Sequence, residues 1–161
     1  MKTLYVLRHG KAAAEADGGS DHERELTKRG QADVQRAAAH LNERAALPSL
    51  VLSSSARRAR QTAALCVGAW PRAVELAIVD ELYLAEPASY LAALAAKGEP
   101  HTRIMVVGHN PGLEALVLLL SERSEHLPTA ALVEIELQIA TWPELSAGSR
   151  GLGRLAHAFR D

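Results

Sequence analysis

The sequence contains a single cysteine, Cys66, and aromatic residues make up only 4% of the chain. One cysteine cannot form an internal disulfide, and it excludes zinc sites built on several cysteines. We interpret Cys66 as a packed core thiol. No apolar run approaches membrane-spanning length, and Arg8 interrupts the apolar start too early for a secretory signal. We therefore expect a cytoplasmic protein without a membrane partner.

The sequence also lacks an excess of charge of either sign. Lys and Arg number 18, Asp and Glu number 19, and the formal net charge is −1. Without a strong positive field, nucleic acid is not an expected partner. The length of 161 residues and the 48% share of hydrophobic residues predict one domain over residues 1–161. We find no repeat, linker or low-complexity tract.

Short apolar runs alternate with segments of helical periodicity. The runs predict strands over residues 4–7, 50–54, 74–79, 103–108, 132–139 and 151–159. The segments between them predict helices over residues 27–46, 57–68, 87–96 and 113–120. This order is typical of a three-layer α/β/α fold with a mainly parallel central sheet. Residues 132–139 alternate apolar and polar side chains, which predicts an antiparallel strand at the sheet edge.

Three of the expected strands end in polar, cationic sequences. These sequences are Arg8-His9-Gly10, residues 53–62 and Gly108-His109-Asn110. The carboxyl ends of parallel strands share one edge of a sheet, so two histidines and several arginines should converge there. Two of the strand ends lead into helices, and we expect Asn110 to cap the second with Pro111 at its first position. Helix N-termini favour anions, so the predicted ligand is phosphate or a close relative.

The expected helix 57–68 carries three arginines near its start, and helical geometry separates them. The side chains that share its buried stripe are Ala59, Thr62, Ala63 and Cys66. Arg57 falls opposite this stripe and is predicted to be solvated. Arg58 and Arg60 lie on the two flanks, so either of them could reach the sheet edge.

Taken together, these motifs resemble the histidine phosphatase (phosphoglycerate mutase-like) superfamily, above all its small SixA-type phosphohistidine phosphatases. The resemblance rests on Arg8-His9-Gly10, on residues 53–63 and on residues 108–112, and it extends to residues 21–30 and 81–83. It implies the phosphoglycerate mutase-like fold. It also implies a phosphatase that needs no metal or other cofactor.

The resemblance assigns roles residue by residue. His9 would be the nucleophile that becomes phosphorylated, and the phosphoryl oxygens would be held by Arg8, Arg58 and His109. Lys11 and Asn110 would be lesser, substrate-binding members of the pocket. The chain departs from the family pattern at Ser55, where proline is common, and at Gly10, where the branch often has alanine. Neither departure removes a catalytic group.

The sequence does not plainly show a general acid for the leaving group. Relatives of the acid phosphatase type carry aspartate directly after the second histidine, where this chain has Asn110. The candidates elsewhere are Glu81, Asp80, Glu15, Asp17 and Asp21. A missing acid matters less when phosphate leaves from a histidine nitrogen, since that bond is labile. The chain is also too short for a large domain covering the pocket.

The predicted function is therefore the dephosphorylation of phosphohistidine on a partner protein. A phosphatase for small phosphate monoesters, such as sugar or nucleotide phosphates, is the enzymatic alternative and would need one of these carboxylates at the pocket. A non-catalytic phosphate-binding protein is the third possibility. The remaining histidines show no metal-ligand spacing and are interpreted as surface or loop residues: His22, His40, His101, His126 and His157. We also expect Asp21 and Arg24 to pair and order the loop that follows the first strand.

Overall fold

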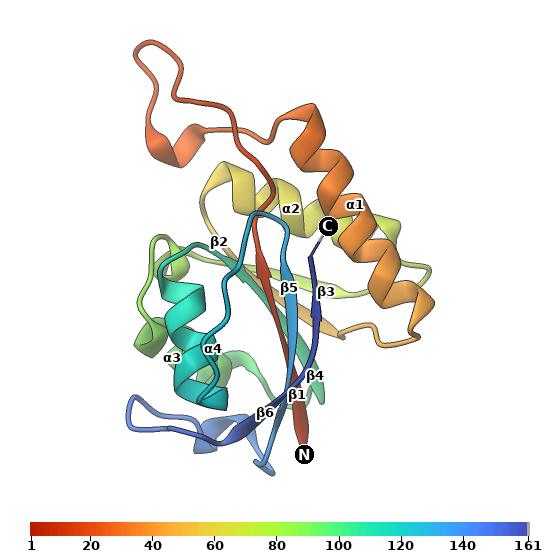
Figure 1. Cartoon of the computed structure of the whole chain (residues 1–161), viewed down its shortest axis with the longest axis vertical. Coiled ribbons are helices and arrows are strands. Elements are labelled where there is room, and N and C mark those ends of the chain that lie inside the picture. Colours follow the sequence, from red (N-terminus) through yellow and green to blue (C-terminus); the bar gives the residue numbers. More distant parts are fainter. Residues whose placement is uncertain (161) are drawn as a thin grey trace.

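The computed structural model describes residues 1–160, in which six strands and four α-helices form a layered α/β fold (Figure 1). The strands are β1 (Lys2–Arg8), β2 (Leu50–Ser54), β3 (Glu75–Val79), β4 (Arg103–Gly108), β5 (Leu132–Leu137) and β6 (Gly153–Phe159). The helices are α1 (Lys28–Glu43), α2 (Arg57–Ala69), α3 (Pro87–Lys97) and α4 (Gly112–Ser121). Three 3₁₀ turns complete the chain: η1 (Asp21–Glu23), η2 (Asp80–Leu82) and η3 (Trp142–Glu144).

The sheet has the strand order β3-β2-β4-β1-β5-β6. The first four strands, β1 to β4, pair with one another in parallel. Strand β5 pairs antiparallel with β1, and β6 pairs antiparallel with β5. The predicted fold class, a mainly parallel sheet with an antiparallel edge strand, is therefore confirmed.

The prediction that residues 132–139 form the edge strand is wrong. Strand β5 lies between β1 and β6, and β6 is the edge. The polar positions of β5 are occupied by Glu134 and Glu136, which pair with Arg44 of the α1 C-cap and Arg154 of β6. The alternation in the sequence therefore reports one polar face of the strand, and it carries no information about a missing neighbour.

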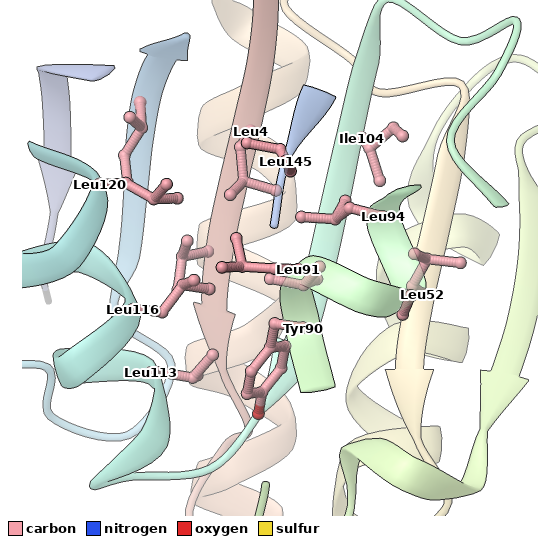
Figure 2. Packing of buried hydrophobic residues seen from close by; sticks show 14 of the residues in the cluster. Leu4, Leu52, Tyr90, Leu91, Leu94, Ile104, Leu113, Leu116, Leu120 and Leu145 are labelled. Carbon is pink, nitrogen blue, oxygen red and sulfur yellow. The ribbon is translucent and has the colours of Figure 1, made fainter. Parts of the chain in front are cut away.

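The two faces of the sheet carry separate hydrophobic clusters, because successive side chains of a strand point to opposite sides. Leu4 and Val6 of β1 pack with residues of α3 and α4, as Figure 2 shows for the cluster around Tyr90 and Leu116. Tyr5 and Leu7 pack with residues of α1 and α2. The predicted three layers follow from this arrangement. No helix within residues 1–160 is both long enough and apolar enough to cross a bilayer.

Helix α1 begins directly against the loop that follows β1. The Thr27 side chain caps the helix by accepting a hydrogen bond from the Gly30 N–H at 2.9 Å, and the Thr27 N–H donates to the Lys11 carbonyl. A Cβ atom on Gly30 would lie 2.2 Å from the Lys11 oxygen, and one on Gly10 would lie 2.7 Å from the Gly30 oxygen. Close backbone contact therefore leaves no room for a side chain at Gly10 or Gly30.

The start of α4 differs from the prediction. The helix begins at Gly112, with Pro111 before its first residue, and Asn110 does not cap it. The Asn110 amide instead donates hydrogen bonds to the Glu114 carboxylate and to the Leu127 carbonyl. Asn110 therefore links two segments of chain, which a helix cap would not do.

Candidate active site

All six residues predicted for the site line one cavity of about 390 Å³ at the carboxyl end of the parallel strands: Arg8, His9, Lys11, Arg58, His109 and Asn110. Arg8 ends β1, and His9 and Lys11 lie in the loop that follows it; Arg58 comes from the first turn of α2, and the last two come from the segment between β4 and α4. His9, Arg58 and His109 are buried. The sheet thus brings together residues about a hundred positions apart in the chain.

The tautomer of His9 is fixed by the hydrogen bond of its Nδ1 atom. This atom lies 2.7 Å from the Gly10 carbonyl oxygen, so Nδ1 carries the proton and Nε2 keeps a lone pair. The Arg58 Nε–H donates to that Nε2 atom at 3.3 Å. Burial, reinforced by the cations Arg58, Arg8 and Arg24, lowers the pKa of His9 to about 4, against the opposing effect of the Gly10 hydrogen bond. His9 is therefore a neutral imidazole at neutral pH.

His109 faces His9 with ring centroids 5.1 Å apart. Its Nδ1 atom lies 3.3 Å from Nη2 of Arg58, which can only donate, so Nδ1 accepts. Its Nε2–H then donates to the Ser54 hydroxyl at 2.7 Å. Burial, followed by the nearby His9 and Arg58, lowers the pKa of His109 to about 3. Both imidazoles are therefore neutral and have fixed tautomers.

Arg58 is the arginine of α2 that reaches the cavity, as its place on the flank of the buried stripe permitted. Its side chain is 4% exposed, whereas the Arg57 side chain is 44% exposed and pairs with Glu25. Arg60 turns away and donates to the Ser55 carbonyl. The Thr62 hydroxyl donates to the Arg58 carbonyl at 2.7 Å and accepts from the Gly10 N–H at 3.1 Å. This hydroxyl joins α2 to the loop after His9.

Arg8 and Asn110 share one acceptor, the carbonyl oxygen of Leu127. Arg8 Nη1 donates to it at 3.0 Å and Asn110 Nδ2 at 2.8 Å. Two further buried atoms, Arg8 Nε and Asn110 Oδ1, have no hydrogen-bond partner within the described residues. Burial lowers the pKa of the Arg8 guanidinium, and the carboxylate of Glu114 opposes that shift.

Asp21 is the one carboxylate among the described residues that line the cavity. It accepts hydrogen bonds from the Tyr83 hydroxyl at 2.5 Å, from Arg24 Nη1 at 3.0 Å and from Arg58 Nη2 at 3.1 Å. The predicted pairing of Asp21 with Arg24 is therefore confirmed. The Tyr83 hydrogen bond, together with Arg24 and Arg58, holds the pKa of Asp21 far below its usual range. The other four candidate acids are exposed and do not line the cavity: Glu15, Asp17, Asp80 and Glu81.

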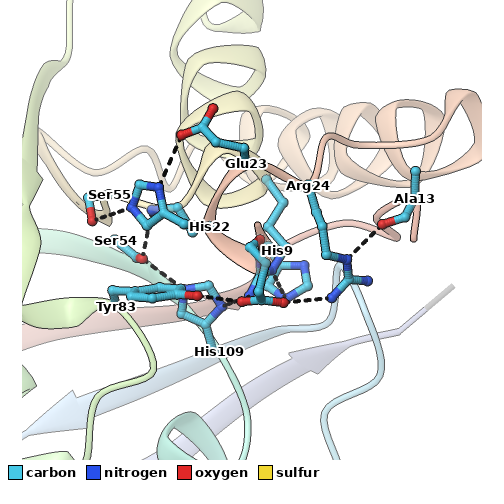
Figure 3. A network of polar contacts seen from close by, with 12 residues as sticks. His9, Ala13, His22, Glu23, Arg24, Ser54, Ser55, Tyr83 and His109 are labelled. Atoms are coloured by element: carbon cyan, nitrogen blue, oxygen red, sulfur yellow. Dashed lines mark hydrogen bonds and ion pairs between the residues drawn. The ribbon is translucent and has the colours of Figure 1, made fainter. Parts of the chain in front are cut away.

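His22 and Tyr83 lie close to His109, as Figure 3 shows, and their contacts were not predicted from the sequence. His22 is only partly exposed: its Nδ1 faces Glu23, its Nε2 accepts from the Ser55 hydroxyl at 3.0 Å, and its ring meets the Tyr83 ring edge-on. Ser55, the position at which the chain departs from the family pattern that its motifs resemble, supplies this hydroxyl. That departure was the available signal that position 55 makes a polar contact.

Two more of the histidines interpreted as surface or loop residues contact each other. The rings of His40 on α1 and His157 on β6 stack, with their Nε2 atoms 2.8 Å apart. His40 also stacks on Phe159. None of these three residues lines the cavity. Their contacts join α1 to the edge strand and serve the fold.

Comparison with known proteins shows similarity over most of the chain. The model of the histidine phosphatase superfamily (branch 1) matches residues 4–83. An uncharacterized protein of Mycobacterium tuberculosis is 34% identical over 160 residues, covering 91% of this chain and 96% of its own.

Solved structures with the same fold differ in their substrates. A protein of Agrobacterium tumefaciens assigned as the phosphohistidine phosphatase SixA is 30% identical, with a TM-score of 0.79 and 99% of each chain covered. A phosphoserine phosphatase of Entamoeba histolytica is 14% identical, with a TM-score of 0.68 and coverage of 98% of this chain and 96% of its own. The chain belongs to the histidine phosphatase superfamily.

Proposed function

We propose that the chain is a phosphatase that forms a phosphohistidine intermediate on His9 and takes phosphohistidine on a partner protein as its substrate. The observation that carries the proposal is the tautomer of His9. Because Nδ1–H is bonded to the Gly10 carbonyl, the lone pair lies on Nε2, which faces the cavity, and a phosphorus atom would replace the long 3.3 Å contact that Arg58 Nε–H makes there. A neutral ring at neutral pH is the nucleophilic form.

In the first step, the lone pair of His9 Nε2 forms a bond to phosphorus while the bond from phosphorus to the substrate nitrogen breaks. That electron pair stays on the leaving imidazole. In the second step, a water oxygen attacks phosphorus, the bond to Nε2 breaks, and the electron pair returns to Nε2. The water gives up its proton to solvent, and inorganic phosphate is released.

Arg8 and Arg58 would stabilise the negative charge that spreads over the phosphoryl oxygens in both steps. Guanidinium groups suit this role because they present several N–H donors in a fixed plane. Phosphoryl transfer depends mainly on such positioning and charge stabilisation. His109 would contribute an N–H once a bound dianion favours its protonation, and Lys11 and Asn110 would line the pocket as secondary contacts.

The state of Asp21 supports phosphohistidine over a phosphate monoester as substrate. An alkoxide leaving group needs a proton from a general acid. Asp21 is held ionised by Tyr83, Arg24 and Arg58, so it has no proton to give. A phosphohistidine ring that is already protonated on its other nitrogen leaves as neutral imidazole and needs no acid from the protein.

The rim of the cavity supports a substrate presented by a protein. Lys11 and Leu84 both line the cavity and are exposed, and the Leu84 side chain offers an apolar contact beside the cationic floor. A phosphorylated side chain on a protein surface could therefore reach His9 while its surroundings rest on this rim.

The test compares the purified protein on a histidine-phosphorylated protein and on a panel of sugar, nucleotide and aryl phosphate monoesters. We expect kcat/KM to be highest for the phosphohistidine protein. Radiolabelled substrate should leave an acid-labile, base-stable label on the wild-type chain, and His9→Ala should lose both label and turnover. A preference for one monoester would establish the small-molecule alternative. Phosphate binding without turnover of any substrate would establish a non-catalytic role.

A further inference from the structure

We propose that Glu114 is a positioning residue for the phosphate pocket, which holds Arg8 and Asn110 in place through the backbone of Leu127. The inference rests on the proposed function, because it assumes that Arg8 binds the phosphoryl oxygens. Glu114 lies in the first turn of α4 and does not line the cavity. It acts from behind the pocket and does not touch the substrate.

One oxygen of Glu114 organises two separate segments. Its Oε1 atom accepts a hydrogen bond from Asn110 Nδ2 at 2.9 Å and another from the Leu127 N–H at 2.9 Å. The Nδ1 atom of His126 lies 3.1 Å from the same oxygen. Glu114 therefore ties the segment before α4 to the segment before β5. A carboxylate oxygen can accept several hydrogen bonds, which an apolar side chain could not do.

The Leu127 backbone carries this constraint to the pocket. Its N–H is held by Glu114, while its carbonyl oxygen accepts from Arg8 Nη1 at 3.0 Å and from Asn110 Nδ2 at 2.8 Å. The Leu127 side chain is fully buried in the core beneath α4. The peptide units on either side of Leu127 are thus fixed by packing and by hydrogen bonds together.

Arg8 and Asn110 have few other contacts that could orient them. Within residues 1–160, the Arg8 side chain makes one hydrogen bond, which is the bond to the Leu127 carbonyl. Its buried Nε atom has no partner there. The Asn110 side chain bonds to Glu114 and Leu127 through Nδ2, while its buried Oδ1 has no partner. Both pocket residues therefore depend on the unit formed by Glu114 and Leu127.

The charge of Glu114 adds to this geometric role. Burial and the nearby charge of Arg58 both disfavour the charged form of Arg8, whereas the carboxylate of Glu114 favours it. His126, the histidine nearest Glu114, is 82% exposed and adds no buried cation. Glu114 therefore favours the charged form of a guanidinium that would face the phosphoryl group.

A double-mutant cycle tests the proposal with the phosphohistidine protein as substrate. Glu114→Ala should lower kcat/KM on the order of tenfold, because misplacing a charge-stabilising group by a fraction of an ångström has effects of that size. Glu114→Gln keeps an acceptor for Leu127 and should lose less. In an Arg8→Ala background, Glu114→Ala should cause almost no further loss, since its effect passes through Arg8. Glu122→Ala is the control, because Glu122 pairs with Arg150 at an exposed site and should keep wild-type activity.

Thermal unfolding separates positioning from structural damage. If Glu114→Ala folds poorly, the same cycle is run with Glu114→Gln, which has nearly the volume of glutamate. Wild-type kcat/KM in both Glu114 variants, or losses that multiply with those of Arg8→Ala, would overturn the inference while leaving the proposed function intact. If the wild-type chain hydrolyses no substrate, the proposed function fails. In that case the affinity for inorganic phosphate, measured by calorimetry, is compared between the wild type and Glu114→Ala. An unchanged affinity would overturn the positioning role of Glu114.

Discussion

The Nε atom of Arg58 lies 3.3 Å from the Nε2 atom of His9, and Nδ1 on the opposite side of that imidazole is bonded to Gly10. An imidazolium would present an N–H to the Arg58 N–H, so this contact requires the neutral ring. The same guanidinium donates to His109 Nδ1, which must also be unprotonated. One arginine thus selects the protonation state of both histidines, because it can only donate.

We expect the His9 and His109 pair to titrate well below the ordinary histidine value of 6.5. The pKa values are lowered to about 4 and about 3, chiefly by burial. NMR titration of the imidazole signals, assigned with His9→Gln and His109→Gln, should show both rings neutral at pH 5.5. Midpoints near 6.5 for the pair would contradict the arrangement of the site.

The same shifts make folding stability depend on pH. Unfolded histidines take up protons as the pH falls through 6.5, whereas folded His9 stays neutral until about pH 4. The unfolded state therefore binds more protons in this window, so the contribution to stability is complete above pH 6.5 and is lost as the pH falls toward 4. The melting temperature should drop more between pH 7 and pH 5 in the wild type than in a His9→Gln/His109→Gln variant. Equal drops would count against the prediction.

Arg58 and its neighbour Arg57 form a matched pair for mutation. The Arg58 side chain is 4% exposed and contacts both histidines, whereas Arg57 pairs with Glu25 at the surface. Arg58→Ala should lower kcat/KM about a hundredfold or more, as expected when a charge-stabilising donor is removed. Arg57→Ala should stay close to wild type, because exposed ion pairs contribute little. The reverse ranking, measured on the same substrate, would show that the wrong arginine has been assigned to the pocket.

The fold and the centre of the site could be predicted because their signals are local. Apolar strands that end in His9 and His109 identify the sheet edge, and helical spacing alone separates Arg58 from Arg57. The mistakes have a shared cause. The alternation over residues 132–139 describes the two faces of one strand. Which strands lie beside it depends on the distant segment that forms β6, and β6 pairs along the outer side of β5. Likewise, Asn110 precedes a helix as a cap residue does, but its amide donates a hydrogen bond to the carbonyl of Leu127, 17 positions away.

The surroundings of the site lay beyond sequence reasoning for the same reason. Asp21 was one of five candidate acids, and the local sequence indicated its pairing with Arg24 but not its place at the cavity. Its environment comes from Tyr83, 62 positions away, and from Arg58, 37 positions away. Three donors from different segments lower the pKa of this carboxylate still further, and only the folded chain brings them together.

The ionised state of Asp21 leads to a prediction about its role. Asp21→Asn should lower kcat by about tenfold because the carboxylate that pairs with Arg58 Nη2 is lost, and by the same factor for phosphohistidine and for aryl phosphates. A series of aryl phosphates that differ in leaving-group pKa measures this directly. If Asp21 donated a proton, the loss would grow as the leaving group became more basic, and our assignment would fail. Asp17→Asn is the control, because Asp17 is exposed in the same loop and does not line the cavity.

Leu84 should determine whether a substrate is recognised as part of a protein. Its side chain is 57% exposed at the rim of the cavity, and its backbone has φ of 49°, a left-handed conformation that is uncommon for a bulky residue. Covering this side chain with a partner would stabilise the complex by about 1 kcal/mol, or roughly fivefold in KM. Leu84→Ser should therefore raise KM for the phosphohistidine protein by that factor and leave kcat unchanged.

Small substrates and a matched surface variant complete the test of Leu84. Phosphoramidate, which is too small to cover the rim, should be hydrolysed equally well by Leu84→Ser and by the wild type. Leu118→Ser is the control, since Leu118 is 47% exposed on α4 and does not line the cavity. An equal rise of KM for phosphoramidate would mean that Leu84 shapes the phosphate pocket itself. In that case the preference for protein substrates would have to come from other residues of the rim.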